Sequence, residues 1–235
     1  MFAWPKVIKK PKGKRILVLA PHMDDEIIGC GGVIRKHTQD HNDVTVIYFT
    51  AGDKGNSSLK SDQNLSEIRK EETKTANQVL GIQHAYFLDY PDAVDGVWED
   101  DGRLRELLTA IKPDLIYLPP YFDLHTDHRK TNWLFREAAQ GWYMGTLCIY
   151  EVWTPVNPNR IVNITQQMED KLEAMRLCKS QTDTLDYVAF TKSLSQYRSK
   201  FALSPMVEFA EAFYMISADE YFAKFKANEF DWHLN

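Results

Sequence analysis

The sequence predicts an α/β fold: a Rossmann-like, mostly parallel sheet with helices on both faces, plus a smaller C-terminal α+β elaboration. Short apolar runs at residues 15–20, 44–49, 85–88 and 114–118 are typical of buried parallel strands. The segments between these runs have helical character, which gives the order β-α-β-α-β-α-β. Such alternation favours a parallel sheet whose crossover connections are right-handed.

The clearest helix is expected to begin after Asn64 and to end at Gly81. Asn64 is a favourable N-cap residue with Glu67 three positions later, and glycine commonly ends a helix in the left-handed conformation. A second helix is predicted from about residue 102 to residue 111, because Pro113 follows it.

The C-terminal third has a weaker pattern. TLCIYEVW and RIVNI are predicted to be strands, and residues 166–180 are predicted to be a helix. Residues 187–201 and 207–216 are ambiguous. The string VEFAEAFYMI, for example, mixes aromatic and β-branched residues with strong helix formers.

The length and composition indicate one domain rather than two full domains. The chain has 235 residues, of which 44% are hydrophobic, which is enough for one sizeable core. We expect a single domain over residues 1–235, with its core at about 14–150 and the C-terminal elaboration at about 151–235.

The charge and the apolar pattern limit the classes of partner. With a net charge of -5, the chain offers no broad cationic field for a nucleic-acid backbone. It has neither the apolar region of a signal peptide nor the ~20 apolar residues that a membrane span requires. Cys30, Cys148 and Cys178 are few and far apart, which is typical of reduced thiols. We therefore expect a cytoplasmic protein without nucleic-acid binding or membrane insertion.

Two strings combine imidazoles with carboxylates. PHMDDE (21–26) directly follows the first predicted strand, and DLHTDH (123–128) follows the fourth. Ligands of open α/β sheets bind at the carboxyl ends of strands, where both strings lie. If the two strands are neighbours, His22, Asp25 and His128 could meet at one metal ion.

Each string has a simpler explanation by itself. Acidic residues after a strand often cap the next helix, and a His-x-x-His pattern can belong to a surface turn. Two such clusters at the ends of parallel strands are harder to explain in this way and favour a metal site. Two imidazoles and one carboxylate leave open coordination positions, as in catalytic zinc sites. Non-haem Fe2+ uses the same type of ligand set, so iron stays open, although zinc suits hydrolysis best.

PHMDDEIIGCGG, followed about a hundred residues later by HTDH, resembles the PIG-L/LmbE-like family of N-acetylglucosaminyl deacetylases. The resemblance covers most of residues 15 to 215, and the two metal motifs are its specific part. It also includes TAGDKG, the IRKEET segment, FLDYPD, KSQ and the late FAEAF.

The resemblance implies that His22, Asp25 and His128 bind Zn2+. Asp24 would then act as general base on the metal-bound water and later protonate the leaving amine. This division of roles is chemically sensible, because a metal ligand cannot easily transfer protons while it holds the ion.

The resemblance implies four further site residues. His125 would assist the oxyanion or the leaving group, and Asp127 would be an orienting carboxylate. Arg69 and Asp92 would bind sugar hydroxyls or an attached group. Arg69 could instead simply pair with Glu72 on its own helix. Sugar-stacking candidates are Tyr121, Phe122, Trp98 and Trp153.

Three details accompany the motifs. Met23 and Thr126 stand where the family usually has proline, and neither side chain is needed to hold a metal. GCGG (29–32) is not the GxGxxG pattern of dinucleotide-binding loops, so close packing of a helix on the sheet is the better interpretation.

The expected activity is zinc-dependent hydrolysis of the N-acetyl amide of an N-acetylglucosamine-type amino sugar or its conjugate, releasing acetate and a free amine. One alternative is a zinc hydrolase for another small amide, including a longer acyl group. Another is a non-catalytic sugar-binding α/β protein with a vestigial metal site. Asp24 and His125 argue against the last, because neither is needed merely to hold a metal. The aglycone and a homo-oligomeric state stay open.

Overall fold

The computed structural model describes residues 4–54, 64–92, 98–182 and 185–226. Within these ranges, one sheet has the strand order β1-β7-β8-β6-β5-β2-β3-β4. The strands are β1 (Lys6–Ile8), β2 (Arg15–Ala20), β3 (Asp43–Thr50), β4 (His84–Tyr90), β5 (Leu115–Leu118), β6 (Thr146–Ile149), β7 (Arg160–Asn163) and β8 (Ala210–Ser217). The helices are α1 (Asp25–Gln39), α2 (Leu65–Leu80), α3 (Arg103–Ile111), α4 (Thr126–Ala139), α5 (Met168–Leu177), α6 (Lys179–Thr182), α7 (Tyr187–Ser199) and α8 (Ala218–Lys226).

The sheet is mostly parallel, as predicted. All neighbouring strands run parallel except β8, which is antiparallel to both β6 and β7. From β2 the chain proceeds to β3 and β4 on one side and then returns to β5 on the other side. The order therefore reverses between β2 and β5, and such switch points are where open α/β sheets bind ligands.

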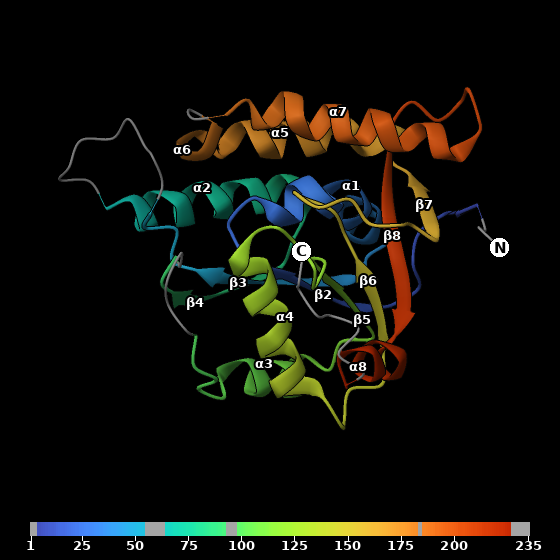
Figure 1. The fold of residues 1–235 in the computed structure, drawn as a ribbon. Helices are drawn as coiled ribbons and strands as arrows, with labels where there is room; N and C mark the ends of the chain where they lie inside the picture. The colour runs from blue at the N-terminus through green and yellow to red at the C-terminus, as the bar shows by residue number, and fades with distance from the viewer. Residues whose placement is uncertain (1–3, 55–63, 93–97, 183–184, 227–235) are drawn as a thin grey trace.

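Helices cover both faces of the sheet (Figure 1). Helices α1 and α2 lie against one face, with α5 and α7 as an outer layer above them, whereas α3, α4 and α8 lie against the other face. This arrangement confirms the predicted α/β class. It also explains why β2 is apolar from Ile16 to Ala20, because both of its faces are covered there.

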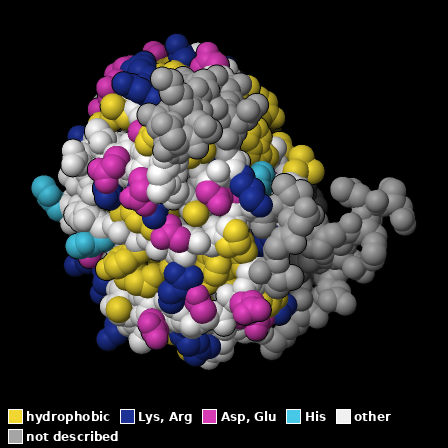
Figure 2. Space-filling model, turned by 90° about the vertical axis from the view of Figure 1, so that its left-hand side faces the viewer, with side chains coloured by type: hydrophobic (Ala, Val, Ile, Leu, Met, Phe, Trp, Pro, Cys, Tyr) yellow, Lys and Arg dark blue, Asp and Glu magenta, His cyan; other side chains and the backbone are white. Residues whose placement is uncertain are grey.

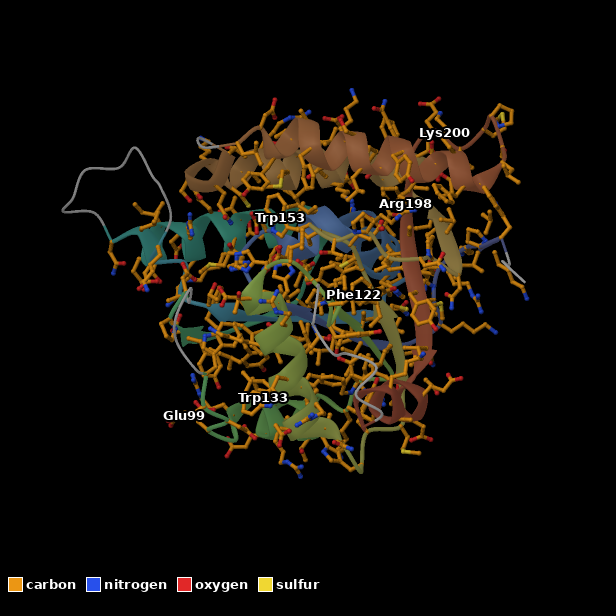
Figure 3. All side chains as sticks on the ribbon, in the orientation of Figure 1. Glu99, Phe122, Trp133, Trp153, Arg198 and Lys200 are labelled. Carbon is orange, nitrogen blue, oxygen red and sulfur yellow. The ribbon has the colours of Figure 1, made fainter. Side chains whose placement is uncertain are left out.

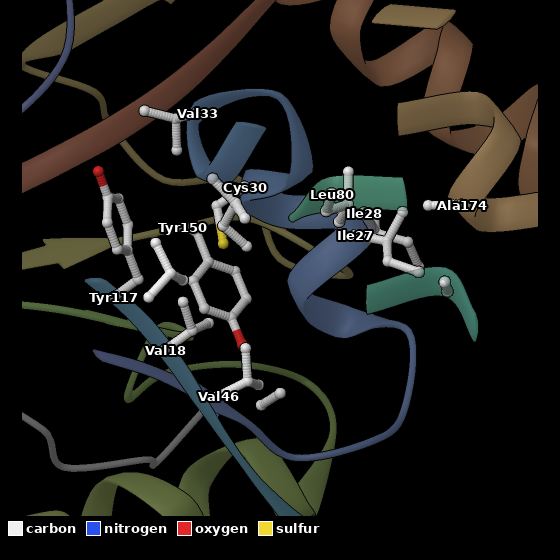
Figure 4. Close-up of a cluster of buried hydrophobic side chains, with 14 of the residues drawn as sticks. Val18, Ile27, Ile28, Cys30, Val33, Val46, Leu80, Tyr117, Tyr150 and Ala174 are labelled. Carbon is white, nitrogen blue, oxygen red and sulfur yellow. The ribbon is translucent and has the colours of Figure 1, made fainter. Parts of the chain in front are cut away.

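Alternate side chains of β2 enter two separate cores. Ile16 and Val18 belong to the core beneath α1, α2 and α5, part of which is drawn in Figure 4. Leu17 and Leu19 belong to the core beneath α3, α4 and α8. Burial of these side chains contributes roughly 1.5–3 kcal/mol each relative to exposure.

The predicted boundaries agree well with the elements in the first two thirds of the chain. The side chain of Asn64 accepts the backbone N–H of Glu67 at the start of α2, and Gly81 ends that helix with a φ of 75°. The helix predicted from about 102 to 111 is α3.

The ambiguous C-terminal segments form one helix and one strand. Residues 187–199 form α7, whereas most of VEFAEAFYMI forms β8, which pairs with β6 on one edge and β7 on the other. The helix predicted at 166–180 is divided into a 3-10 turn (Thr165–Gln167), α5 and α6. Strands β7 and β8 thus continue the same sheet.

On the face shown in Figure 2, acidic and basic side chains are interspersed with hydrophobic ones. Among the described residues, none of the helices combines the length and the apolar character that crossing a membrane would require.

Candidate metal centre and catalytic residues

The PHMDDE turn lies between the end of β2 and the first turn of α1. Asp24 occupies the N-cap position of α1, but its side chain forms no capping hydrogen bond. The Asp25 Oδ2 atom accepts the backbone N–H of His22 at 2.9 Å and lies 3.1 Å from His22 Nδ1. Helix capping alone therefore does not account for these carboxylates.

The DLHTDH string connects β5 to α4. His125 is the N-cap residue of α4, and its Nδ1 accepts the backbone N–H of Asp127 at 3.2 Å. His128, in the first turn of α4, is fully buried, and its Nε2 lies 3.1 Å from Asp25 Oδ2. Because β2 and β5 are paired neighbours, the two strings meet.

The donor atoms are close enough to share a divalent cation. Ring nitrogens of His22, His125 and His128 lie within 4.8 Å of one another. Asp25 Oδ2 is 3.1 Å from a nitrogen of both His22 and His128, similar to the roughly 3.3 Å expected between ligands of one tetrahedral zinc ion. Both ring nitrogens of His128 are buried and face carboxylate oxygens, Nε2 that of Asp25 at 3.1 Å and Nδ1 that of Asp123 at 3.2 Å. His22, Asp25 and His128 therefore fit as ligands of one metal ion.

His22 and His128 each have a further carboxylate beside the ring. Asp127 Oδ2 is 3.3 Å from His22 Nε2, and Asp123 Oδ2 is 3.2 Å from His128 Nδ1. Such carboxylates orient metal-binding histidines and fix their tautomers. The orienting character predicted for Asp127 thus has a geometric basis. The sequence analysis gave Asp123 no role, although it is the first residue of DLHTDH.

The carboxylates keep positive charge on the imidazoles. Burial lowers the pKa of His22, but hydrogen bonds with Asp127 and Asp25 outweigh it and raise the pKa to about 10. Burial likewise lowers the pKa of His128, whereas the charge of Asp25 and a contact with Asp123 raise it to about 9. The cluster therefore attracts positive charge, which a bound cation would supply in place of the protons.

The surroundings of Asp24 favour its protonated form, and those of His125 favour its neutral form. Burial and the negative charge of Asp25 raise the pKa of Asp24 to about 7. Burial and the charges of His22 and His128 lower the pKa of His125. Since His125 Nδ1 accepts a backbone N–H, the neutral ring carries its proton on Nε2, which is then a donor.

Arg69 does not pair with Glu72. Its Nη1 donates to the carbonyl of Gly52 at 3.0 Å, and its Nε is buried without a hydrogen-bond partner among the described residues. Glu72 instead accepts the backbone N–H and the hydroxyl of Ser180, in the KSQ segment. Gln181 of the same segment donates to the carbonyl of Met23 at 2.7 Å and so supports the PHMDDE turn.

Asp92 lies beside the same site. Its carboxylate accepts the backbone N–H groups of Gly52 at 3.3 Å and Lys54 at 3.0 Å. One of its oxygens also lies within 4.8 Å of ligand atoms of His22 and Asp127. The structure thus brings all eight predicted site residues to one end of the sheet.

The aromatic candidates differ in exposure. Trp98 is only 2% exposed and belongs to the core on the α3 side. Trp153, labelled in Figure 3, is 37% exposed and stacks on Phe190 of α7, with ring centroids 5.5 Å apart. Tyr121 and Phe122 are half-buried and pack edge to face. Trp153 is therefore the most exposed residue of the four.

Comparisons with known proteins identify the family of this chain. A family model described as PIG-L, GlcNAc-PI de-N-acetylase, matches residues 17–139. Diacetylchitobiose deacetylase of Thermococcus kodakarensis is 30% identical over 190 residues, which cover 72% of this chain and 70% of that protein.

Solved structures show the same fold. N,N'-diacetylchitobiose deacetylase from Pyrococcus horikoshii matches with a TM-score of 0.73 and 27% identity, over 89% of this chain and 86% of that chain. GalB, the 4-carboxy-2-hydroxymuconate hydratase of Pseudomonas putida KT2440, matches with a TM-score of 0.75 and 20% identity, over 86% and 95% of the two chains. The hydratase shows that the fold alone does not determine the reaction.

Proposed function

This chain belongs to the PIG-L family of de-N-acetylases, and from that premise we propose that it hydrolyses the N-acetyl amide of an N-acetylglucosamine-type sugar or its conjugate. The products are acetate and the free amine. The observation that carries the proposal is the position of Asp24 and His125 beside the cluster of His22, Asp25 and His128.

His22, Asp25 and His128 would hold the metal ion, with zinc as the first choice. Two imidazoles and one carboxylate leave coordination positions open, which distinguishes catalytic from structural zinc sites. When bound, zinc lowers the pKa of a coordinated water towards ~7 and polarises the carbonyl of the amide. Asp127 and Asp123 would hold the two imidazoles in the orientation that binding requires.

Asp24 transfers the proton. It accepts a proton from the water whose oxygen attacks the acetyl carbon, and it donates that proton to the nitrogen as the carbon–nitrogen bond breaks. In the metal-free cluster, burial and the negative charge of Asp25 raise the pKa of Asp24 to about 7, so its carboxylate is a stronger base than that of an exposed aspartate. His125 donates its Nε2–H to the carbonyl oxygen as negative charge develops there.

Arg69 and Asp92 would bind the sugar or its attached group. Arg69 holds the carbonyl of Gly52 through Nη1, and its guanidinium carries further N–H donors that would suit substrate hydroxyls. The carboxylate of Asp92 can accept hydroxyl groups while it holds the backbone of Gly52. These two side chains would thus suit a small-molecule amino-sugar conjugate as the substrate.

The test measures acetate release from N-acetylglucosamine conjugates with different aglycones and from analogues with longer acyl groups. We expect about one zinc per chain and loss of activity with a chelator. Asp24→Asn should keep the zinc and lower kcat by about 10²–10⁴-fold, since it keeps the shape and loses the base.

Asp219→Asn, at an exposed position of α8, is the control and should leave both measurements unchanged. A fully active metal-free protein would contradict the proposed mechanism. If no conjugate releases acetate, the sugar-binding alternative is favoured, and preferential release of a longer acyl group favours the other hydrolase.

A further inference from the structure

Helix α1 contains a break between its first turn and the rest of the helix. Cys30 has a φ of −147° and a ψ of 16°, outside the helical region. In an uninterrupted helix the backbone N–H of Gly32 would donate to the carbonyl of Ile28. Both of these groups have other partners in this structure.

The partners are a buried ion pair contributed by the C-terminal third of the chain. Glu211 of β8 accepts the N–H of Gly32 at 2.7 Å and the N–H of Val33 at 2.8 Å. Lys171 of α5 donates to the carbonyl of Ile28 at 2.8 Å and to Glu211 at 2.7 Å. The ion pair thus bridges the two sides of the break.

The glycines of GCGG allow this close contact. A Cβ atom at Gly32 would lie 2.7 Å from Ile164, and one at Gly29 would lie 2.2 Å from the ring of Tyr150. Figure 4 shows the ring of Tyr150 beside Cys30, which belongs to α1 like the two glycines. GCGG is therefore closely packed, as expected, but against residues that directly follow β6 and β7 rather than against the strands themselves.

We infer that Lys171 and Glu211 are positioning residues, which hold the break in α1 and thereby place the carboxylate of Asp25 against His128. The inference rests on the proposed function. Asp25 lies five residues before the break, whereas His128 is held on α4. A change in the direction of the first turn therefore moves Asp25 relative to His128.

Stability alone is a weak explanation for this ion pair. The side chains of Lys171 and Glu211 are 1% and 2% exposed, and desolvation of buried charges can cost as much as their attraction returns. Apolar side chains could fill the same space. They could not, however, satisfy the carbonyl and the two N–H groups that the break leaves without helical partners.

Two variants and one control test the inference. The double variant Lys171→Met with Glu211→Gln removes both charges, so that neither is left buried without its partner. Glu211→Asp keeps both charges and shortens the reach of the carboxylate by one methylene. The control, Asp170→Asn, removes another ion pair between α5 and α1, in which Asp170 contacts Arg35 at 2.6 Å beyond the break.

The primary measurement is zinc affinity, determined by competition with a chromophoric chelator, with folding checked by circular dichroism. We expect zinc affinity to fall about tenfold or more in both variants, as for other groups that orient metal ligands, and to be unchanged in the control. On any conjugate that the wild type cleaves, kcat should fall about 10²-fold while KM changes little.

Folded variants whose zinc affinity and kcat equal those of the control would overturn the inference, even if their melting temperatures are lower. The proposed function is tested separately by the wild type. A wild type that binds zinc and releases no acetate contradicts the function, while the zinc affinities of the variants still test the positioning by Lys171 and Glu211.

Discussion

The carboxylate of Asp123 is expected to set the metal affinity of His128. It is fully buried and lies 3.2 Å from His128 Nδ1, so it favours the tautomer whose Nε2 is free to bind an ion. Asp123→Asn keeps the size and removes the charge. Zinc affinity should fall about 10- to 100-fold in a chelator competition assay.

Asp114→Asn is a matched control for Asp123. Asp114 lies at the opposite end of β5, where it pairs with Arg15 at 2.6 Å on the surface. Its loss should leave zinc affinity unchanged and alter stability by about 1 kcal/mol at most. Equal zinc affinity in both variants would mean that His128 is oriented without Asp123.

For individual residues, the sequence predicted which side chains form the metal-binding cluster better than it predicted the contacts between them. His22, Asp25 and His128 follow from two strings at the ends of strands, and the structure brings them together. Asp123 and Asp127 flank the same histidine pair, but which carboxylate faces which ring nitrogen depends on side-chain rotation. Spacing along the chain does not determine that rotation.

Among the elements, the first turn of α1 depends on the absence of a side chain at Gly29. Replacing glycine by alanine within a helix normally stabilises a protein by about 1 kcal/mol. Here the added Cβ would lie 2.2 Å from the Tyr150 ring and 2.9 Å from the carbonyl of Glu151. Overpacking of this kind costs typically about 1–3 kcal/mol, so Gly29→Ala should destabilise the protein in urea unfolding.

Gly31→Ala offers the comparison. Its Cβ would lie 3.2 Å from the Cγ atom of Lys171 and 3.6 Å from the Cγ2 atom of Ile27, which is a much milder approach than at Gly29, so the loss in free energy of unfolding should be clearly smaller. Equal losses would show that the contact with Tyr150 does not limit the packing of α1.

The boundaries of elements could be predicted where local signals decide them. Asn64 and Gly81 delimit α2 because capping and the left-handed conformation are local properties. The strand character of residues 210–217 is not local. It depends on pairing with β6 and β7, whose positions follow only from the whole topology.

For the whole molecule, the sequence predicted the α/β class, and the strand order explains the location of the site. β2 and β5 are neighbours at the point where the order reverses, so the ends of both strands face one cluster. The role of the C-terminal third could not be predicted in this way. Within it, Glu211 of β8 contacts Gly32 and Val33 of α1, which precede it in the chain by 179 and 178 positions.

The pH dependence of global stability should be separable from that of the site. His37 is fully buried near the other end of α1, where its Nε2 lies 2.9 Å from the hydroxyl of Tyr117. Burial, opposed by a hydrogen bond with Asn42 and assisted by the charge of Lys10, lowers the pKa of His37 to about 4. In the unfolded chain its pKa is about 6.5.

As the pH falls below about 6.5, the unfolded chain gains a proton on His37 that the folded protein does not gain until about pH 4. The stability that neutral His37 contributes is therefore present above this window and lost within it. The loss amounts to about 2 kcal/mol between pH 7.5 and pH 5. Urea unfolding at these two pH values should show a weaker pH dependence for His37→Gln than for the wild type. His84→Gln, which changes an exposed histidine, should behave like the wild type.

If His37→Gln loses as much stability as the wild type over this interval, the acid sensitivity arises from other groups.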